Sequence, residues 1–290
     1  MRATDPIKGE LFRFSAKDGL NLHGLLVKSK ENNKNVVINV FGMTGDFFSW
    51  DLYFEMTNKF KGSNFDLFLA NNRGMGMFTP FVKKNKRFTI GTSKEIFEEC
   101  IYDLNGAVDL LEKLGYTSII LMGHSTGCQK TTYYMYKTKD SRIKSLILLA
   151  PADDYNITMK ELGDRHDEAL KVAKVMVKNK KGDEKLPEGI SKHYTAKRFL
   201  SYADLKNVEA RLFNYYSDLK EFSRIKCPIF VSFGEKEEYA MKPVKEYIEK
   251  LKGKTSATKF GWEIVKGANH NFDGKHKELV SAIFKWLSNV

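Results

Sequence analysis

Strand-like and helix-like segments alternate along most of the 290-residue chain, and this alternation limits the possible folds more than any other feature. Short apolar runs predict strands at 20–28, 35–41, 65–70, 118–122, 144–150, 228–233 and 258–265. Helical patterns lie between them, near 46–60, 126–138, 243–252 and 275–288. Strands joined by helices favour a parallel sheet with right-handed crossovers and helices on its faces. The sequence therefore indicates the α/β class.

One further helix is expected between the strands at 65–70 and 118–122. Thr92 and Glu95 have the spacing of a capping box, which marks a helix N-terminus. Gly115 is a suitable stop for this helix. Between these two signals, apolar residues recur at helical intervals: Ile96, Phe97, Cys100, Ile101, Leu104, Val108 and Leu111.

The alternation breaks at Pro151. Residues 152–224 are rich in charge and contain helical stretches such as 166–178, but no run typical of a buried strand. We therefore predict a core made of residues 1–151 and 225–290, with residues 152–224 as a helical insertion over one edge of the sheet.

The composition narrows the function classes. An apolar fraction of 42% is that of a globular protein and excludes a disordered chain. The net charge of +12 comes from lysines spread along the whole sequence, which indicates a solvated surface rather than a nucleic-acid site, although it could draw in anionic substrates. We expect no nucleic-acid partner, and the sequence does not indicate an oligomeric state.

Metal, disulfide and membrane signals are absent from the sequence. The three cysteines are widely spaced and form no C-x-x-C pair, so neither a disulfide framework nor a zinc site is expected. No apolar run approaches the roughly 20 residues that a membrane span needs, and the N-terminal residues contain no secretory signal. We expect a cytoplasmic protein without cofactor, metal or membrane insertion.

The stretch TSIILMGHSTGCQKT at 117–131 contains the strongest chemical signal. It places Ser125 in a G-x-S-x-G pattern between an apolar strand and a segment able to form a helix, which is the context of a nucleophile elbow. So sharp a turn requires neighbours without side chains, here Gly123 and Gly127. The helix N-terminus at this point favours developing negative charge. Ser125 is therefore a candidate nucleophile.

A serine nucleophile needs a base, and His270 is the best placed of the six histidines. It lies in the loop GANHNF, between the last predicted strand and the last helix, where it could reach over the C-terminal edge of the sheet. His124 is adjacent to Ser125 and is expected to point elsewhere.

The histidine in turn needs a carboxylate to orient it. The loop after the strand 228–233 offers Glu235, Glu237 and Glu238, and a charge run of this kind is normally a solvated turn, so two of the three are expected to be only that. Asp153 and Asp154, directly after the strand 144–150, remain alternatives. The chain order Ser–acid–His holds for every choice.

Main-chain donors for an oxyanion are expected from two places. The strand 35–41 runs into Gly42-Met43-Thr44-Gly45, where glycines allow close approach of the backbone. The N–H of Met43 would pair with that of Thr126; the alternative is an ordinary glycine turn.

Five segments resemble the α/β-hydrolase superfamily: FGMTG at 41–45, NNRGMG at 71–76, GHSTG at 123–127, GEKEEY at 234–239 and GANHNF at 267–272. The resemblance covers nearly the whole chain apart from the insertion. It implies a triad of Ser125, Glu237 and His270, with Glu237 at a position where the family more often has aspartate. Residues 152–224 would then be the cap that covers the pocket. Phe41 stands where members usually have histidine, which leaves the main-chain donor unchanged.

The expected function is hydrolysis of carboxylic esters of small molecules, and the GHSTG segment is similar to esterase, lysophospholipase and monoacylglycerol lipase-like hydrolases. A thioesterase, amidase, peptidase or acyltransferase could use the same residues, because fold and triad do not set the substrate. A binding protein of this fold without chemistry is the alternative from another class. Six apolar residues could line an acyl pocket or simply pack: Phe47, Phe48, Trp50, Val172, Val175 and Met176.

Overall fold

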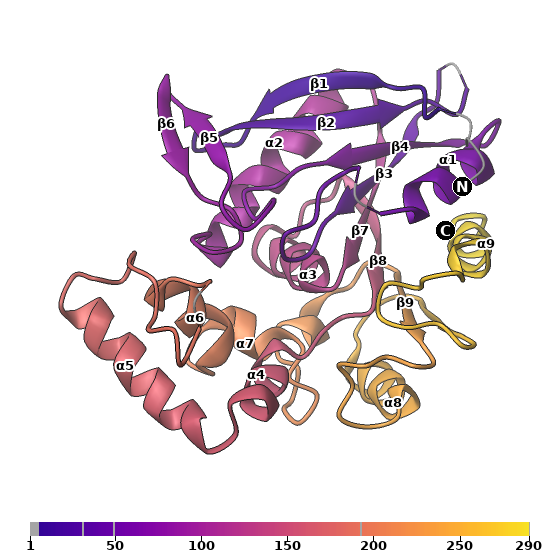
Figure 1. Cartoon of the computed structure of the whole chain (residues 1–290). Helices are drawn as coiled ribbons and strands as arrows, with labels where there is room; N and C mark the ends of the chain where they lie inside the picture. Colours follow the sequence, from indigo (N-terminus) through magenta and orange to yellow (C-terminus); the bar gives the residue numbers. More distant parts are fainter. Residues whose placement is uncertain (1–5, 31, 49, 192, 290) are drawn as a thin grey trace.

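The computed structural model describes residues 6–30, 32–48, 50–191 and 193–289. Residues 1–5, 31, 49 and 290 of the predicted core and residue 192 of the predicted insertion lie outside the described residues. An eight-stranded sheet has the order β1-β2-β4-β3-β7-β8-β9-β10 (Figure 1). Its strands are β1 (Glu10–Ser15), β2 (Asn21–Val27), β3 (Asn35–Val40), β4 (Phe65–Ala70), β7 (Ser118–His124), β8 (Ile143–Leu149), β9 (Ile229–Gly234) and β10 (Phe260–Val265). From β4 to β10 all neighbours are parallel, and β2 pairs antiparallel with β1 and β4. The predicted mostly parallel sheet is confirmed.

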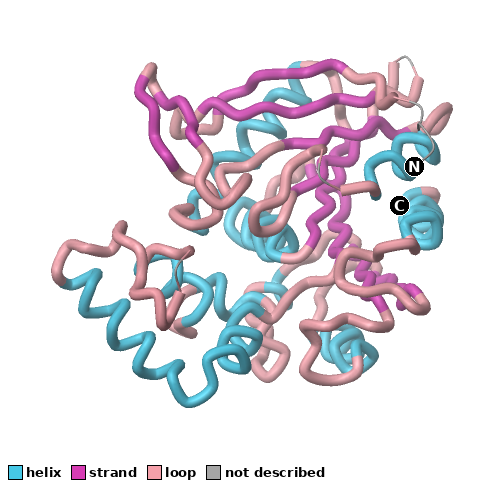
Figure 2. The backbone as a smooth tube through the Cα atoms, in the orientation of Figure 1, coloured by secondary structure: helices cyan, strands magenta, loops and turns pink. Residues whose placement is uncertain are grey.

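Helices cover both faces of this sheet (Figure 2). On one face the buried side chains come from α2 (Cys100–Lys113), α3 (Thr126–Thr138) and α8 (Val244–Lys254). On the other face they come from α1 (Leu52–Phe60) and α9 (His276–Leu287). The central strands alternate between the two layers as a strand's period of two requires: in β7, Ile119 and Leu121 face α2 and α3, while Ile120 and Met122 face the opposite layer. Burial on both sides explains why these strands are continuous apolar runs.

The insertion between β8 and β9 is helical, as predicted. It contains α4 (Asp154–Leu162), α5 (His166–Lys178), α6 (Ala196–Ala203) and α7 (Val208–Leu212). Figure 1 shows these four helices gathered at the lower left, beyond the ends of the strands. Small residues on α5 and α6, such as Ala169, Ala173 and Ala196, let the two helices pack closely around Phe199.

The predicted capping box at Thr92 and Glu95 is wrong. The first helical residues are a 3₁₀ turn at Phe97–Glu99, and α2 begins at Cys100. Thr92 Oγ1 instead accepts the N–H of Thr44 and donates to the carbonyl of Gly74. The local spacing is that of a cap, but tertiary partners use both side chains.

Three strands had no clear sequence signal. They are β1 and the hairpin of β5 (Pro80–Lys83) and β6 (Lys86–Thr89). All four residues of β6 are exposed, so the strand shows no alternation between apolar and polar positions. The predicted helix at 46–60 also begins later than expected, at Leu52.

Candidate active site

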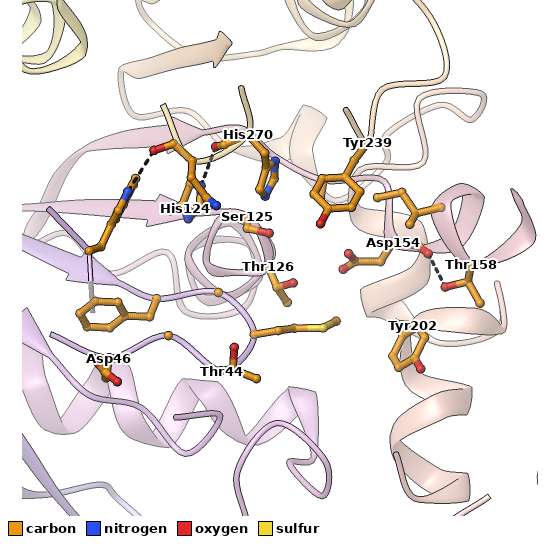
Figure 3. A pocket seen from close by; sticks show the side chains of 18 of the residues that line it. Thr44, Asp46, His124, Ser125, Thr126, Asp154, Thr158, Tyr202, Tyr239 and His270 are labelled. Atoms are coloured by element: carbon orange, nitrogen blue, oxygen red, sulfur yellow. Dashed lines mark hydrogen bonds between the residues drawn. The ribbon is translucent and has the colours of Figure 1, made fainter. Parts of the chain in front are cut away.

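The loops that follow β3, β7, β9 and β10 meet at one edge of the sheet, because parallel strands present their carboxyl ends together. These loops hold four of the five residues predicted to act: Met43 after β3, Ser125 after β7, Glu237 after β9 and His270 after β10. The fifth, Thr126, is the first residue of α3. Ser125 and His270 line one cavity of about 560 Å³ (Figure 3).

Ser125 has the backbone conformation of a sharp turn, with φ 54° and ψ −129°, directly before α3. The expectation that its neighbours must lack side chains is confirmed. A Cβ added to Gly123 would lie 2.4 Å from the carbonyl oxygen of Gly127, and one added to Gly127 would lie 2.1 Å from that of Val40. The strained turn holds the Ser125 side chain at the wall of the cavity rather than in the core.

The His270 ring contacts a carboxylate on its far side. Nδ1 of His270 lies 2.7 Å from Oε1 of Glu237, and both side chains are at least nine-tenths buried. This contact fixes the tautomer and leaves Nε2 free on the side where Figure 3 shows the ring facing Ser125. Among the described residues no hydrogen bond joins Ser125 Oγ to this ring, a gap common in ligand-free sites.

Glu235 and Glu238 are exposed, as the sequence suggested for two of the three glutamates, but each also accepts a main-chain hydrogen bond. Glu238 accepts the main-chain N–H of His270 at 2.8 Å, and Glu235 accepts that of Gly267 at 2.8 Å. Each of the three glutamates after β9 therefore binds the loop that carries His270. Only Glu237 contacts the imidazole.

His124 also holds the His270 loop, and the sequence did not reveal this role. Its Nε2 lies 3.0 Å from the carbonyl oxygen of His270, and its ring packs 4.3 Å from the ring of Trp50. Trp50 in turn donates to the carbonyl of Asn271 at 3.0 Å. Burial, together with the charge of His270, lowers the pKa of His124 to about 3, so its ring is neutral and donates through Nε2.

Asp153 and Asp154 do not contact His270. Asp153 accepts the N–H of Asn156 at 3.1 Å and that of Tyr215 at 3.1 Å, so it caps α4, and burial raises its pKa to about 6. Asp154 lines the cavity, where its Oδ2 accepts from the Gln129 amide at 2.7 Å. Of the five carboxylates considered from the sequence, Glu237 alone lies against Nδ1 of the histidine.

The loop after β3 lies against the elbow. A Cβ added to Gly42 would be 3.0 Å from Cβ of Ser125 and 3.3 Å from the main-chain nitrogen of Thr126. Within the described part of the chain, the N–H groups of Met43 and Thr126 have no acceptor. Both residues line the cavity.

Buried polar contacts fix the loop after β3 in this position. Asn72 donates to the carbonyl of Phe41 at 3.2 Å, and the N–H of Thr44 donates to Thr92 Oγ1 at 2.8 Å. Lys130, fully buried on α3, joins Asn72 at 3.0 Å and Glu95 at 2.8 Å. The segment 71–76 therefore connects the loop to the elbow helix.

Of the six apolar residues considered for an acyl pocket, only Trp50 is among the cavity residues. Val172 and Met176 pack against the core of the insertion, while Phe48 and Val175 are exposed.

The described residues contain no group of three or more His, Cys, Asp or Glu side chains able to bind a metal, and the three cysteines are free. None of the helices described has the length and apolarity that a membrane crossing requires.

Solved structures with the same fold cover almost the whole chain. The siderophore hydrolase EstB of Aspergillus fumigatus superposes with a TM-score of 0.70 at 18% identity, over 98% of each chain. A soluble variant of the Saccharomyces cerevisiae monoglyceride lipase gives 0.67 at 15% identity, over 99% of this chain and 97% of that one. The Bacillus subtilis carboxylesterase CesB gives 0.60 at 18% identity, over 98% and 93%. The predicted α/β-hydrolase fold is confirmed.

Sequence comparison gives a more specific relationship. No curated protein matches the chain significantly. A family model described as "Protein of unknown function (DUF1749)" matches residues 96–288, which is more than half of the chain and includes Ser125, Glu237 and His270. The chain therefore belongs to the DUF1749 family.

Proposed function

We propose that the protein is a serine hydrolase of carboxylic esters. The observation that carries this proposal is the placement of Ser125, on a strained elbow, in the same cavity as a histidine whose Nδ1 lies 2.7 Å from a buried glutamate. The three structural relatives described above are a carboxylesterase, a siderophore hydrolase and a monoglyceride lipase, which supports the same reaction class.

In the proposed reaction Ser125 Oγ forms a bond to the ester carbonyl carbon while its proton passes to Nε2 of His270. Glu237 orients the ring and stabilises the imidazolium. The N–H groups of Met43 and Thr126 donate hydrogen bonds to the carbonyl oxygen as it becomes negatively charged, a contribution of about 3 kcal/mol per donor in related sites. Collapse breaks the bond to the alcohol, which takes the proton from His270. Water then repeats the cycle and releases the acid and free Ser125.

We further propose that residues 152–224 act as the cap of the site. Asp154, Thr158 and Glu161 from α4 and Tyr202 from α6 all line the cavity, opposite the loops of the core. Substrate size and chemistry would then be set by α4 and α6 rather than by α5, whose Val175 faces solvent.

Hydrolysis of p-nitrophenyl esters from acetate to palmitate tests the proposal, with wild type, Ser125→Ala and Ser118→Ala in parallel. Ser118 lies at the opposite end of β7 and serves as the matched control. We expect activity in wild type and Ser118→Ala, its loss in Ser125→Ala, and labelling of Ser125 by a fluorophosphonate. Activity that survives in Ser125→Ala would contradict the mechanism. Absence of both hydrolysis and labelling would favour a binding protein.

A further inference from the structure

The charge of the cavity is opposite to that of the chain. The sequence has 48 basic and 36 acidic residues, yet the residues that line the cavity include four carboxylates and, within the described chain, neither lysine nor arginine. The four are Asp46, Asp154, Glu161 and Asp273. None of them forms an ion pair with a described residue. Glu161 and Asp273 are exposed, whereas the fully buried carboxylates Glu95 and Glu209 are paired. The negative charge in the cavity has no internal counter-charge.

Asp154 is the carboxylate aimed at the reacting centre. Figure 3 shows its side chain projecting from the start of α4 toward the space in front of Ser125 and Thr126. Gln129 donates to Oδ2, while Oδ1 accepts no hydrogen bond from the described residues. Arg198 is the cation that acts on Asp154, and it binds Glu209 at 2.8 Å and lies 3.4 Å from Glu95. Burial and the charge of Glu209 raise the pKa of Asp154 well above its usual range, as expected for a carboxyl group that lacks a cation.

Two largely buried residues, Thr126 and Tyr202, also line this cavity with hydroxyl groups that are unpaired within the described chain. Thr126 is 1% exposed and Tyr202 is 6% exposed, and neither hydroxyl has a hydrogen-bond partner among the described residues. Both hydroxyls are therefore available to a ligand in this cavity.

Aromatic rings complete the wall around these polar groups. Trp50, Tyr194, Tyr202 and Tyr239 all line the cavity, and Tyr239 packs edge-on 4.8 Å from the His270 ring. Aromatic faces beside unpaired carboxylates attract organic cations, because the ring quadrupole and the carboxylate act on the same charge. An anionic substrate would meet three further carboxylates besides Asp154, and neither lysine nor arginine among the described residues that line the cavity. The expectation from net charge, that the protein could draw in anions, does not hold at this cavity.

We propose that the cavity in front of Ser125 recognises esters that carry an ammonium group, with Asp154 as the counter-ion of that group. This inference rests on the proposed ester hydrolysis. The ammonium group could belong to the acid or to the alcohol of the ester, because Ser125 attacks the same carbonyl carbon in either case.

Isosteric pairs of esters test the inference. On the acid side, the p-nitrophenyl ester of γ-trimethylammoniobutyric acid is compared with its carbon isostere, in which tert-butyl replaces trimethylammonium. On the alcohol side, butyrylcholine is compared with its carbon isostere. The mono-p-nitrophenyl ester of glutaric acid is the anionic comparison. The ratio of kcat/KM within a pair does not depend on the amount of folded enzyme, so a partly folded variant still gives a valid answer.

Wild type should prefer the cationic member of at least one pair by about tenfold, mainly through KM, and should hydrolyse the anionic ester worst. In Asp154→Asn the preference should fall to within about twofold of unity. Asp167→Asn, which removes the same charge from an exposed position on α5, should retain the wild-type ratio. A ratio near unity in wild type, or a ratio unchanged in Asp154→Asn, would overturn the inference.

A binding measurement tests the ammonium site independently of the proposed hydrolysis. The same esters are titrated by calorimetry into Ser125→Ala, which cannot form the acyl-enzyme. Selective binding of the cationic esters without hydrolysis by wild type would retain the recognition site and reject the hydrolase. Hydrolysis of neutral and cationic esters alike, with equal binding, would retain the hydrolase and reject the ammonium site.

Discussion

Glu237 Oε1 and His270 Nδ1 lie 2.7 Å apart, and the next residue, Glu238, binds the main-chain N–H of the same histidine at 2.8 Å. Two adjacent carboxylates thus hold one residue at two different points. Only the first contact sets the tautomer and orientation of the ring. The second holds the backbone, as Glu235 does at Gly267.

Glu237→Gln and Glu238→Gln should therefore differ sharply. Glutamine at 237 allows the wrong tautomer and does not stabilise the imidazolium, so kcat should fall by about 10³- to 10⁴-fold. Glutamine at 238 still offers a carbonyl oxygen to the N–H, so the loss should stay below about tenfold. Steady-state hydrolysis of one p-nitrophenyl ester compares the two. Equal losses would mean that Glu237 acts only by holding the loop.

Gly42→Ala tests the position of the oxyanion loop. The new Cβ would lie 2.9 Å from the carbonyl oxygen of His124 and 3.0 Å from Cβ of Ser125, so the loop must move away from the elbow. Displacement of one N–H donor should lower kcat by about 10²-fold.

Gly189→Ala is the matched control for this variant, because a Cβ there meets nothing within 4 Å. Its kcat should equal that of wild type. Circular dichroism confirms that both variants are folded. A Gly42→Ala protein that is folded and fully active would exclude Met43 N–H as an oxyanion donor.

The sequence located Ser125 and His270 because local signals specify them. The elbow glycines are required by contacts of 2.4 Å or less, and a loop between a strand and the last helix must lie at the carboxyl edge of the sheet. The sequence does not determine which carboxylate contacts the His270 ring. Three glutamates fall within four residues, and the turn after β9 decides which of them reaches Nδ1.

Long-range polar contacts could not be predicted from local spacing. Thr92 and Glu95 match a capping box, yet Glu95 pairs with Lys130 and Arg198, which follow it by 35 and 103 positions. The role of His124 depends likewise on a carbonyl that is 146 positions away. The apolar stripe on α5 left open whether it lines a pocket or packs. It packs on α6, and the residues that line the cavity come instead from α4 and from Tyr202 of α6.

His124 should make the stability of the protein depend on pH. Its pKa falls from 6.5 to about 3 on folding, so below pH 6.5 the unfolded chain binds a proton that the folded chain does not. The free energy of unfolding should then decrease by up to about 1.4 kcal/mol per pH unit as the pH drops from 6.5 toward 3. Above pH 6.5 this group should have no effect.

His124→Gln isolates this contribution, since glutamine keeps an N–H donor for the His270 carbonyl but does not titrate. Urea unfolding at pH 7, 6, 5 and 4 should give a shallower pH dependence in the variant than in wild type, by about 1.4 kcal/mol per unit. Parallel curves for the two proteins would show that His124 is not held neutral in the folded state.

Arg198 should be the main anchor of the insertion on the core. It is fully buried on α6, binds Glu209 at 2.8 Å and the carbonyl of Thr92 at 3.1 Å, and lies 3.4 Å from Glu95. Replacement by methionine of similar length leaves Glu209 buried without its counter-charge. Breaking a buried pair from one side costs about 3–5 kcal/mol, so Arg198→Met should lower the free energy of unfolding by that amount.

Two further variants separate charge from packing in this network. Arg165→Met removes an exposed arginine of the insertion whose one hydrogen bond to the described residues is with the carbonyl of Gly189. This variant should change the free energy of unfolding by less than about 0.5 kcal/mol. Adding Glu209→Gln to Arg198→Met removes the unpaired charge, so the double variant should be more stable than the single one. If the double variant is instead less stable, the arginine anchors the insertion through its packing and its bond to Thr92, because the isolated charge of Glu209 would then cost little.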